Sequence, residues 1–209
     1  AIRVIHVWDW EWKHRNQHTK SFLLSAIRKN QVKIGARKCE FIWSDSEQDK
    51  KQVRKFLDRY HLQQGVNCVY VIKIIYEGEM IGCATFGKHH RKSEGWVLSR
   101  FCTKFNHTVQ GGLAKLSKLA YSKLKEPIVS WADYRLSDGN GYEKAGWEKD
   151  KLLRPDYFYH LGGRKMISKQ SRQKKKIGTP KEMTEYEHAK QDGLERVWDC
   201  GKIRFIYKR

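Results

Sequence analysis

The stretch from Trp96 to Asp133 constrains the fold of this 209-residue chain more than any other part of the sequence. It contains an apolar strand, WVLSRF, a loop that ends in Gly111-Gly112, a helical pattern over 110–125 and a second apolar strand, IVSWAD. A helix between two strands is typical of domains in which helices pack against a sheet. Paired glycines at a helix start let backbone N–H groups approach an anion, so they indicate a diphosphate site, although an ordinary loop has the same pattern. No GxxxxGK[ST] motif is present.

The rest of the chain continues this alternation of strands and helices. Periodicity predicts a strand at 2–8, a helix at 16–29, a strand at 36–45, a helix at 46–61, a hairpin at 68–88, strands at 95–105 and 126–135, a short helix within 137–146 and a strand at 155–162. Thr179, Pro180 and Glu182 predict a further helix start, and 196–208 predicts a hairpin turning at Asp199-Cys200-Gly201. From residue 36 to 162 the predicted order is β-α-β-β-β-α-β-α-β.

Charge limits the classes of partner. Lys and Arg number 43 and Asp and Glu 23, a net charge of +20. A chain this basic binds polyanions, because each neutralised phosphate releases counterions, so double-stranded DNA or another nucleic acid is the leading expected partner. A merely solubilising surface and an anionic membrane surface are the alternatives, but no long basic amphipathic helix is evident.

Hydrophobic content and cysteine usage limit the compartment. Hydrophobic residues make up 39% of the chain, which is enough for a packed core, and no apolar run reaches the length of a membrane span. Five cysteines, with no CxxC, argue against a disulfide framework or zinc knuckle, and Cys83 and Cys102 lie in apolar runs as expected for core thiols. No signal peptide opens the sequence, so a reducing cytoplasm is expected.

Three motifs together resemble the GNAT acyltransferase fold. They are QGGLAKL after a strand, IVSWADYR, and NGYEKAGW. The resemblance implies a mixed α/β (α+β) fold with a mostly antiparallel sheet flanked by helices, in which two neighbouring strands splay apart. It also implies acetyl-CoA or a related acyl donor, held on the Arg100, Gln110, Gly111 and Gly112 side.

Within that fold, residues 37–209 are similar to a phage group related to the Mom DNA-modification proteins. The shared segments are FLDRYHLQQG, ATFGK, WVLSRF, VQGG, WADYRLSDGNGYEKAGW, PDYFY and VWDCGKIRF. This resemblance implies a phage-encoded protein in the host cytoplasm, modification of adenine in DNA, and iron. Residues 1–36 resemble the last strand and helix of a Vsr-like nuclease and form an expected strand-helix appendage; related domains are joined to phage homing endonucleases.

His61 and Asp133 are the leading candidates for chemistry. His61 ends a helix before QQG, where an imidazole can act as a base or metal ligand, or simply complement the helix dipole. Asp133 follows an apolar strand, so its carboxylate is either paired, with Arg135 as the obvious partner, or functional. The Mom-like resemblance favours a functional pair and a tentative metal site at these two residues.

Tyr142 is the third catalytic candidate. It lies on the short helix near the place where the acyl sulfur lies in the GNAT fold, so it could protonate a leaving thiolate. The alternative is an aromatic side chain that packs on the sheet.

Two basic runs form the expected nucleic-acid surface. Their residues are Lys88, His89, His90, Arg91 and Lys92 in one loop, and Arg164, Lys165, Lys169, Arg172, Lys174, Lys175 and Lys176 in the other. Such runs are often only solvated, but two of them in a chain of charge +20 indicate phosphate contacts. An extruded base could stack on Tyr157 or Tyr159.

The sequence therefore predicts a GNAT-like transferase that modifies a nucleic-acid base, with adenine in DNA as the first candidate. Two alternatives remain open: a non-catalytic DNA-binding module or remnant of a homing endonuclease, and a GNAT that acts on another amine, such as charged tRNA.

Overall fold

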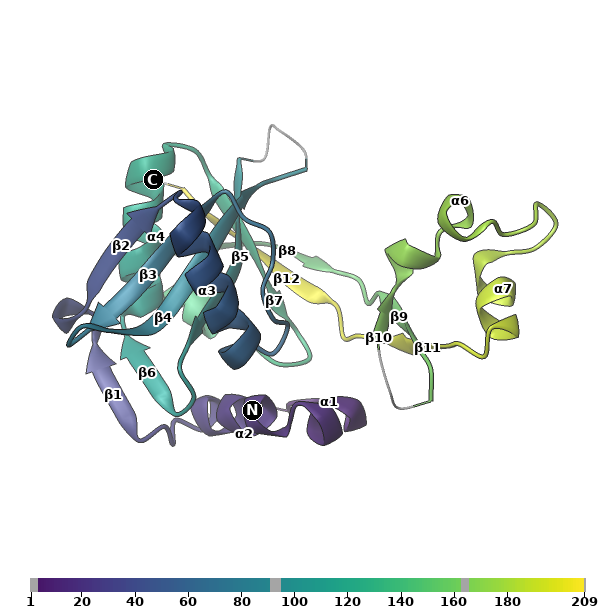
Figure 1. Ribbon diagram of the computed structural model, residues 1–209, viewed down its shortest axis with the longest axis horizontal. Helices are drawn as coiled ribbons and strands as arrows, with labels where there is room; N and C mark the ends of the chain where they lie inside the picture. Colours follow the sequence, from purple (N-terminus) through teal and green to yellow (C-terminus); the bar gives the residue numbers. More distant parts are fainter. Residues whose placement is uncertain (1–3, 91–94, 163–165, 209) are drawn as a thin grey trace.

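The computed structural model describes residues 4–90, 95–162 and 166–208. Its largest element is a seven-stranded sheet in the order β2-β3-β4-β5-β7-β12-β8 (Figure 1). These strands are β2 (Glu40–Ser44), β3 (Tyr70–Tyr76), β4 (Glu79–Lys88), β5 (Trp96–Thr103), β7 (Ile128–Asp133), β8 (Glu148–Leu153) and β12 (Lys202–Tyr207). Every neighbouring pair is antiparallel except β5 and β7. The predicted mixed and mostly antiparallel sheet is confirmed.

The parallel strands β5 and β7 separate after a short paired stretch. They pair only at Trp96 with Ile128 and at Val97 with Val129. One residue further on, the Ser130 hydroxyl donates a hydrogen bond to the Leu98 carbonyl over 3.0 Å. Beyond that point no backbone pairing between the two strands is seen, so space for a ligand opens between them.

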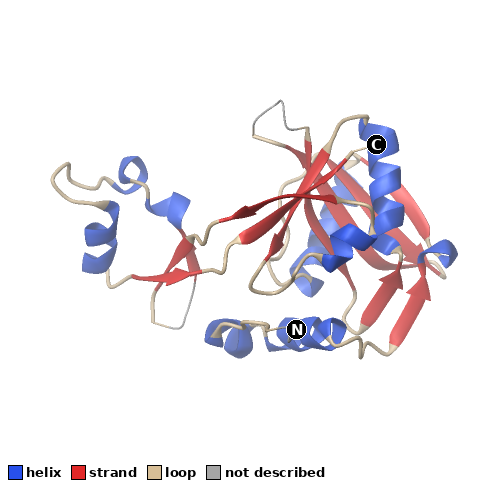
Figure 2. Cartoon of the chain, turned by 180° about the vertical axis from the view of Figure 1, so that it is seen from behind, coloured by secondary structure: helices blue, strands red, loops and turns tan. Residues whose placement is uncertain are grey.

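Helices cover both faces of the sheet, as predicted (Figures 1 and 2). Helix α3 (Glu47–Tyr60) buries Val53, Phe56 and Leu57 against one face. Helix α4 (Gly112–Leu124) buries Leu116 and Ala120 in a separate cluster on the other. Successive residues of a strand point to opposite faces, so one sheet supports both layers.

A smaller three-stranded sheet, β10-β9-β11, lies to one side of the main sheet (Figure 1). Its elements are β9 (Tyr157–His160), β10 (Met166–Ser168), the 3-10 turn η3 (Lys169–Arg172), α6 (Lys174–Ile177), α7 (Glu185–Gln191) and β11 (Glu195–Trp198). Tyr159, Ala189 and Leu194 form its core.

Two predictions in this region are wrong. Strands β11 and β12 are not a hairpin, because β11 pairs with β9 whereas β12 enters the main sheet between β7 and β8. Ile203, Phe205 and Tyr207 of β12 are buried there, which outweighs the local turn signal. The late helix begins at Glu185 and not near Pro180, because Thr184 and Glu187 form the capping box.

The N-terminal segment also differs from the prediction. Residues 4–8 belong to no strand, and helix α1 (Asp9–His14) follows at once; α2 (Asn16–Ala26) confirms the helix expected there. A two-stranded sheet joins β1 (Val32–Gly35) to β6 (His107–Gln110), and the 3-10 turn η1 (Ala36–Lys38) follows β1. Whether residue 36 is a domain boundary stays a prediction.

The short helix α5 (Asn140–Lys144) follows β7, as expected. Cys83 is buried and Cys102 half-buried, and both contact the α3 cluster as predicted for core thiols. Across the described ranges, no helix is long and apolar enough to cross a membrane.

Candidate active site

Two cavities meet where β5 and β7 separate. The smaller, of about 410 Å³, extends toward α2, and the larger, of about 730 Å³, extends along β5 toward Arg100 and the first turn of α4. The residues that line both are His61, Gln63, Phe101, Trp131, Asp133, Ser137 and Tyr142. The three predicted catalytic residues are among these seven, so the fold brings them together at the junction.

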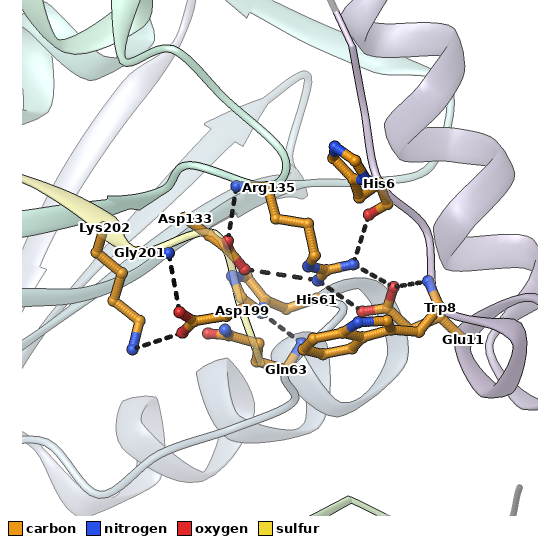
Figure 3. Close-up of polar contacts among 10 residues, drawn as sticks. All are labelled: His6, Trp8, Glu11, His61, Gln63, Asp133, Arg135, Asp199, Gly201 and Lys202. Atoms are coloured by element: carbon orange, nitrogen blue, oxygen red, sulfur yellow. Dashed lines mark hydrogen bonds and ion pairs between the residues drawn. The ribbon is translucent and has the colours of Figure 1, made fainter. Parts of the chain in front are cut away.

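The ring of His61 has one nitrogen already engaged. His61 caps the C-terminus of α3, and the backbone N–H of Gln63 donates to its Nδ1 over 3.0 Å (Figure 3). Burial, helped by the charges of Arg100 and His18, lowers the pKa of His61 to about 3. The imidazole is therefore neutral at pH 7, with its proton on Nε2. In this tautomer His61 is a hydrogen-bond donor, whereas the sequence indicated a base or metal ligand.

Asp133 is the last residue of β7, and neighbouring groups balance the charge of its carboxylate only in part. Its Oδ1 accepts the backbone N–H of Arg135 at 3.0 Å, and its Oδ2 lies 3.5 Å from the Arg135 guanidinium. Burial raises the pKa of Asp133 and the charge of Asp199 adds to this, while Arg135 and Lys202 act in the opposite direction. A carboxylate with a raised pKa is a stronger base than an ordinary surface aspartate.

Arg135 does not neutralise Asp133, because its main partner is Glu11. The guanidinium forms two bonds to the Glu11 carboxylate, of 2.6 and 2.9 Å, and stacks on Trp8 at 3.9 Å. Figure 3 shows it between Asp133 on one side and Glu11 with Trp8 on the other. Arg135 and Glu11 are both buried. The expected contact between Asp133 and Arg135 is thus present, but it is longer than the contacts between Arg135 and Glu11.

Asp199 is a second carboxylate at this end of the sheet, with a structural role. Its Oδ1 accepts the backbone N–H groups of Asp156 and Gly201, both at 2.8 Å, and its Oδ2 lies 3.6 Å from Lys202. These bonds hold the chain where it passes from the small sheet into β12. Asp199 therefore supplies the like charge near Asp133 without facing the cavities itself.

Tyr142 combines the two possibilities that the sequence left open, a packing role and a place in the site. Its ring stacks on Phe205 at 4.8 Å, so it packs on the sheet, yet it also lines both cavities. The Ser130 hydroxyl gives its proton to Leu98, so the phenol donates to Ser130 over 2.9 Å. Burial raises the pKa of Tyr142, which keeps the phenol protonated at neutral pH.

Only one of the four predicted donor-binding residues lies at one of these two cavities. Arg100 lines the larger cavity, where its guanidinium donates to the carbonyls of Ser99 and Gln64 at 2.7 and 3.2 Å. Within the described ranges no carboxylate is in ion-pair distance of Arg100. Gln110, Gly111 and Gly112 line neither cavity.

The glycine loop is contacted by the segment around Ala36. Gly111 has a φ of 75° and precedes α4, as a glycine at a helix start should. A side chain at Gly111 would meet Ala36, and the Lys115 ammonium binds the carbonyls of Ala36 and Cys39 at 3.0 and 2.8 Å. The turn η1 therefore contacts the start of α4, while Gly111 itself is exposed; sequence motifs alone did not indicate this contact.

Comparison with known proteins gives a fold-level result. No family model matches the chain, and no curated protein sequence matches it. Similar solved structures exist, and several of them are acetyltransferases.

One is a GNAT family acetyltransferase from Elizabethkingia anophelis with acetyl-CoA bound, at 13% identity and TM-score 0.44, covering 82% of this chain and 99% of its own. Another is an acetyltransferase from Bacillus subtilis in complex with CoA, at 11% identity and TM-score 0.43, covering 82% and 98%. A third is the diaminobutyrate acetyltransferase of Paenibacillus lautus, at 16% identity and TM-score 0.39, covering 80% and 93%. These likenesses are distant, so the chemistry of the site is argued from its own residues.

The iron implied by the Mom-like resemblance does not fit these residues. No three His, Cys, Asp or Glu side chains of the described segments are placed to hold a metal ion. His61 has Nδ1 occupied by Gln63, and the neighbouring Arg100 charge disfavours a cation. Two side chains, one of them a hydrogen-bond donor, do not make an iron site.

We therefore expect the purified protein to contain iron far below one atom per chain when measured by elemental mass spectrometry. Adding a ferrous salt and then desalting should not change this. Stoichiometric iron that is lost on His61→Ala would contradict the tautomer assigned to His61.

Five of the eight predicted nucleic-acid contacts that the structure describes already have side-chain partners. Lys88 pairs with Glu126 at 3.1 Å and lies over Trp96. His89 is buried, and its ring lies 4.2 Å from that of His90 and 6.0 Å from that of Trp131.

In the second basic run, which lies beside the small sheet, some side chains form ion pairs and others do not. Lys169 pairs with Asp156, and Arg172 with Asp192. Lys174, Lys175 and Lys176 are exposed on α6, and in the described parts of the chain no carboxylate pairs with them. The predicted contacts Arg91, Lys92, Arg164 and Lys165 lie outside the described residues.

Sequence motifs did not identify the N-terminal contributors to the site. His18 and Asn30 line the smaller cavity, and Glu11 holds Arg135. One signal was available: Glu11 lies among tryptophans, and an acid in such surroundings needs a buried cation.

Proposed function

We propose that this chain transfers an acyl group from a thioester in the larger cavity to an uncharged amine in the smaller one. The observation that carries the proposal is the shared wall: His61, Asp133 and Tyr142 line both cavities at the place where they meet. A donor and an acceptor placed there would have their reacting atoms beside the same three side chains.

The larger cavity suits a donor that combines an apolar arm with phosphates. Val97, Leu98 and Leu113 give it an apolar wall, and Arg100 adds a cation without a carboxylate partner among the described residues. Acetyl-CoA or a related thioester is the proposed donor, with Arg100 as the phosphate contact. Leu113, in the first turn of α4, brings that helix start to the cavity wall.

The three shared residues divide the chemistry between them. A bound thioester would supply an activated acyl carbon and a thiolate leaving group. Asp133 takes the proton from the attacking amine while the C–N bond forms and the C–S bond breaks. His61 donates Nε2–H toward the oxygen that gains charge. Tyr142, once its hydroxyl turns from Ser130, gives a proton to the departing sulfur.

The smaller cavity suits an uncharged and planar acceptor. Phe22, Tyr60, Phe101 and Trp131 contribute aromatic rings to its wall, and Asp133 is the one carboxylate among the described residues that line it. An aliphatic ammonium would call for more acidic surroundings. The exocyclic amine of a nucleobase is uncharged and planar, and a chain of charge +20 would attract nucleic acid. Adenine in duplex DNA is the acceptor that the sequence resemblance implies.

The test of donor use is release of free thiol from acetyl-CoA. Purified protein should release thiol in the presence of duplex DNA and not in its absence. Thiol release that does not depend on duplex DNA, but rises with charged tRNA or another amine, would replace the DNA base as the acceptor. Binding of DNA without any thiol release from acyl-CoA donors would favour a non-catalytic module.

DNA binding should depend steeply on salt through α6. Replacing Lys174, Lys175 and Lys176 by Ser should flatten the slope of log affinity against log salt by about 0.9 for each phosphate that these lysines neutralise. Fluorescence anisotropy on a labelled duplex measures this slope. Lys50→Ser is the matched control, because Lys50 already pairs with Glu47 at 2.9 Å. An unchanged slope in the triple variant would remove α6 from the interface.

A further inference from the structure

Asn30 presents a fixed and unused hydrogen-bond acceptor at the smaller cavity. The residue is 5% exposed and lies between α2 and β1. Its Nδ2 donates both hydrogens, to the His107 carbonyl at 3.0 Å and to Thr108 Oγ1 at 2.9 Å. These bonds fix the orientation of the amide, because a carbonyl can only accept. Oδ1 is buried and has no partner in the described parts of the chain.

His18 presents a second acceptor at the same cavity. Its Nε2 is buried and has no hydrogen-bond partner within the described residues. Burial and the nearby Arg15 charge lower the pKa of His18, while the backbone carbonyl of Arg59 raises it by accepting a hydrogen bond from the ring. Since Nε2 is unpartnered, that bond uses Nδ1, and Nε2 keeps its lone pair. The ring is held edge-on against Phe105 at 5.0 Å.

Two buried acceptors without donors are costly unless a ligand meets them. A buried polar group without a partner destabilises a protein, because the water that it gave up on folding is not replaced. Such groups in a folded chain call for a specific explanation, such as a bound water or a ligand. Here both line the cavity that contains His61 and Asp133, and both come from the N-terminal segment.

We propose that Asn30 and His18 select the acceptor by receiving hydrogen bonds from its N–H groups, so that the N-terminal segment determines specificity. This inference rests on the proposed function, since it assumes that the smaller cavity holds the acceptor. The ligand class is a planar heterocycle with an exocyclic amino group, whose two N–H groups meet the two acceptors on binding and one of whose protons passes to Asp133 as the C–N bond forms. Ring systems with a carbonyl or hydrogen in place of that amine leave the two acceptors unpaired and bind weakly.

The test compares nucleosides that differ only in the amino group. Calorimetry would measure adenosine against purine riboside, and cytidine against pyrimidin-2-one riboside, on the full chain. For each amino nucleoside that binds, the partner without the amine should bind about tenfold more weakly, as expected when one or two hydrogen bonds are missing.

Two variants assign this discrimination to residues. His18→Phe keeps the ring contact with Phe105 and removes the acceptor, and Asn30→Ala removes Oδ1; each should cut the discrimination to about threefold or less. Ser122→Ala, at an exposed position of α4 outside both cavities, is the control and should leave it unchanged. If Asn30→Ala unfolds, the nucleoside pairs on the wild type and His18→Phe still decide.

Three results would overturn the inference. One is equal binding of the paired nucleosides, which would mean that water satisfies both acceptors. Another is full discrimination in His18→Phe and Asn30→Ala. The third is no binding of any of the four nucleosides. DNA-dependent thiol release is measured separately, so the proposed function can survive any of these results.

Discussion

Asp133→Asn is expected to slow acyl transfer by about 10²–10⁴-fold, the usual contribution of a positioned general base. The amide cannot take the proton from the attacking amine. Asn keeps an oxygen for the backbone N–H of Arg135, so the fold should persist. DNA-dependent thiol release, with melting temperature and DNA affinity alongside, measures the effect. Asp45→Asn is the control, since Asp45 is an exposed residue away from both cavities.

The pH profile gives an independent check on Asp133. The carboxylate works only when ionised, so the rate should fall as pH drops through the pKa of Asp133. Because burial raises that pKa, the fall should begin at a higher pH than for an ordinary aspartate. His61 has a pKa of about 3 and does not titrate in this range. A rate that stays constant down to the ordinary Asp range, or a folded Asp133→Asn with wild-type rate, would remove Asp133 from the chemistry.

Glu11→Gln is expected to destabilise the fold by about 3–5 kcal/mol, the usual cost of removing one partner of a buried ion pair. Arg135 would keep its charge in a buried place with Asp133 as the nearest remaining acid. That charge should then act more strongly on Asp133 and lower its pKa. Urea unfolding measures the first effect, and a shift of the activity profile to lower pH measures the second.

Asp9→Asn is the matched control on the same helix. Asp9 pairs with Lys13 at 3.4 Å on the exposed side of α1, so its loss should change neither stability nor the pH profile appreciably. If Glu11→Gln leaves both quantities at their wild-type values, Arg135 is not held by Glu11. Loss of stability without a shift in the pH profile would make Glu11 a purely structural residue.

Local patterns predicted the parts of the fold that local forces determine. Helix α3 begins after its Ser46 cap within the range 46–61 that periodicity predicted, and β3 and β4 form the hairpin predicted over 68–88. His61, Asp133 and Tyr142 were predicted from what the resemblances imply, and the structure places all three in the wall that the two cavities share.

What the sequence could not predict depends on contacts between distant residues. Asn30 bonds to His107 and Glu11 to Arg135, at separations of 77 and 124 residues, which no periodicity encodes. The protonation state of His61 also depends on contacts that the sequence does not reveal. His61 was a reasonable base by position, but one backbone N–H from Gln63 and the charge of Arg100 convert it to a donor.

Mass spectrometry of nucleosides from DNA co-expressed with the chain tests directly whether a base gains an acyl group. Three samples are compared: wild type, Asp133→Asn and the control Asp45→Asn. The proposed transfer predicts a nucleoside whose mass has grown by an acyl group in the wild type and in Asp45→Asn, and its absence with Asp133→Asn. An acylated nucleoside at equal yield with folded Asp133→Asn, or no acylated nucleoside with the wild type, would contradict it.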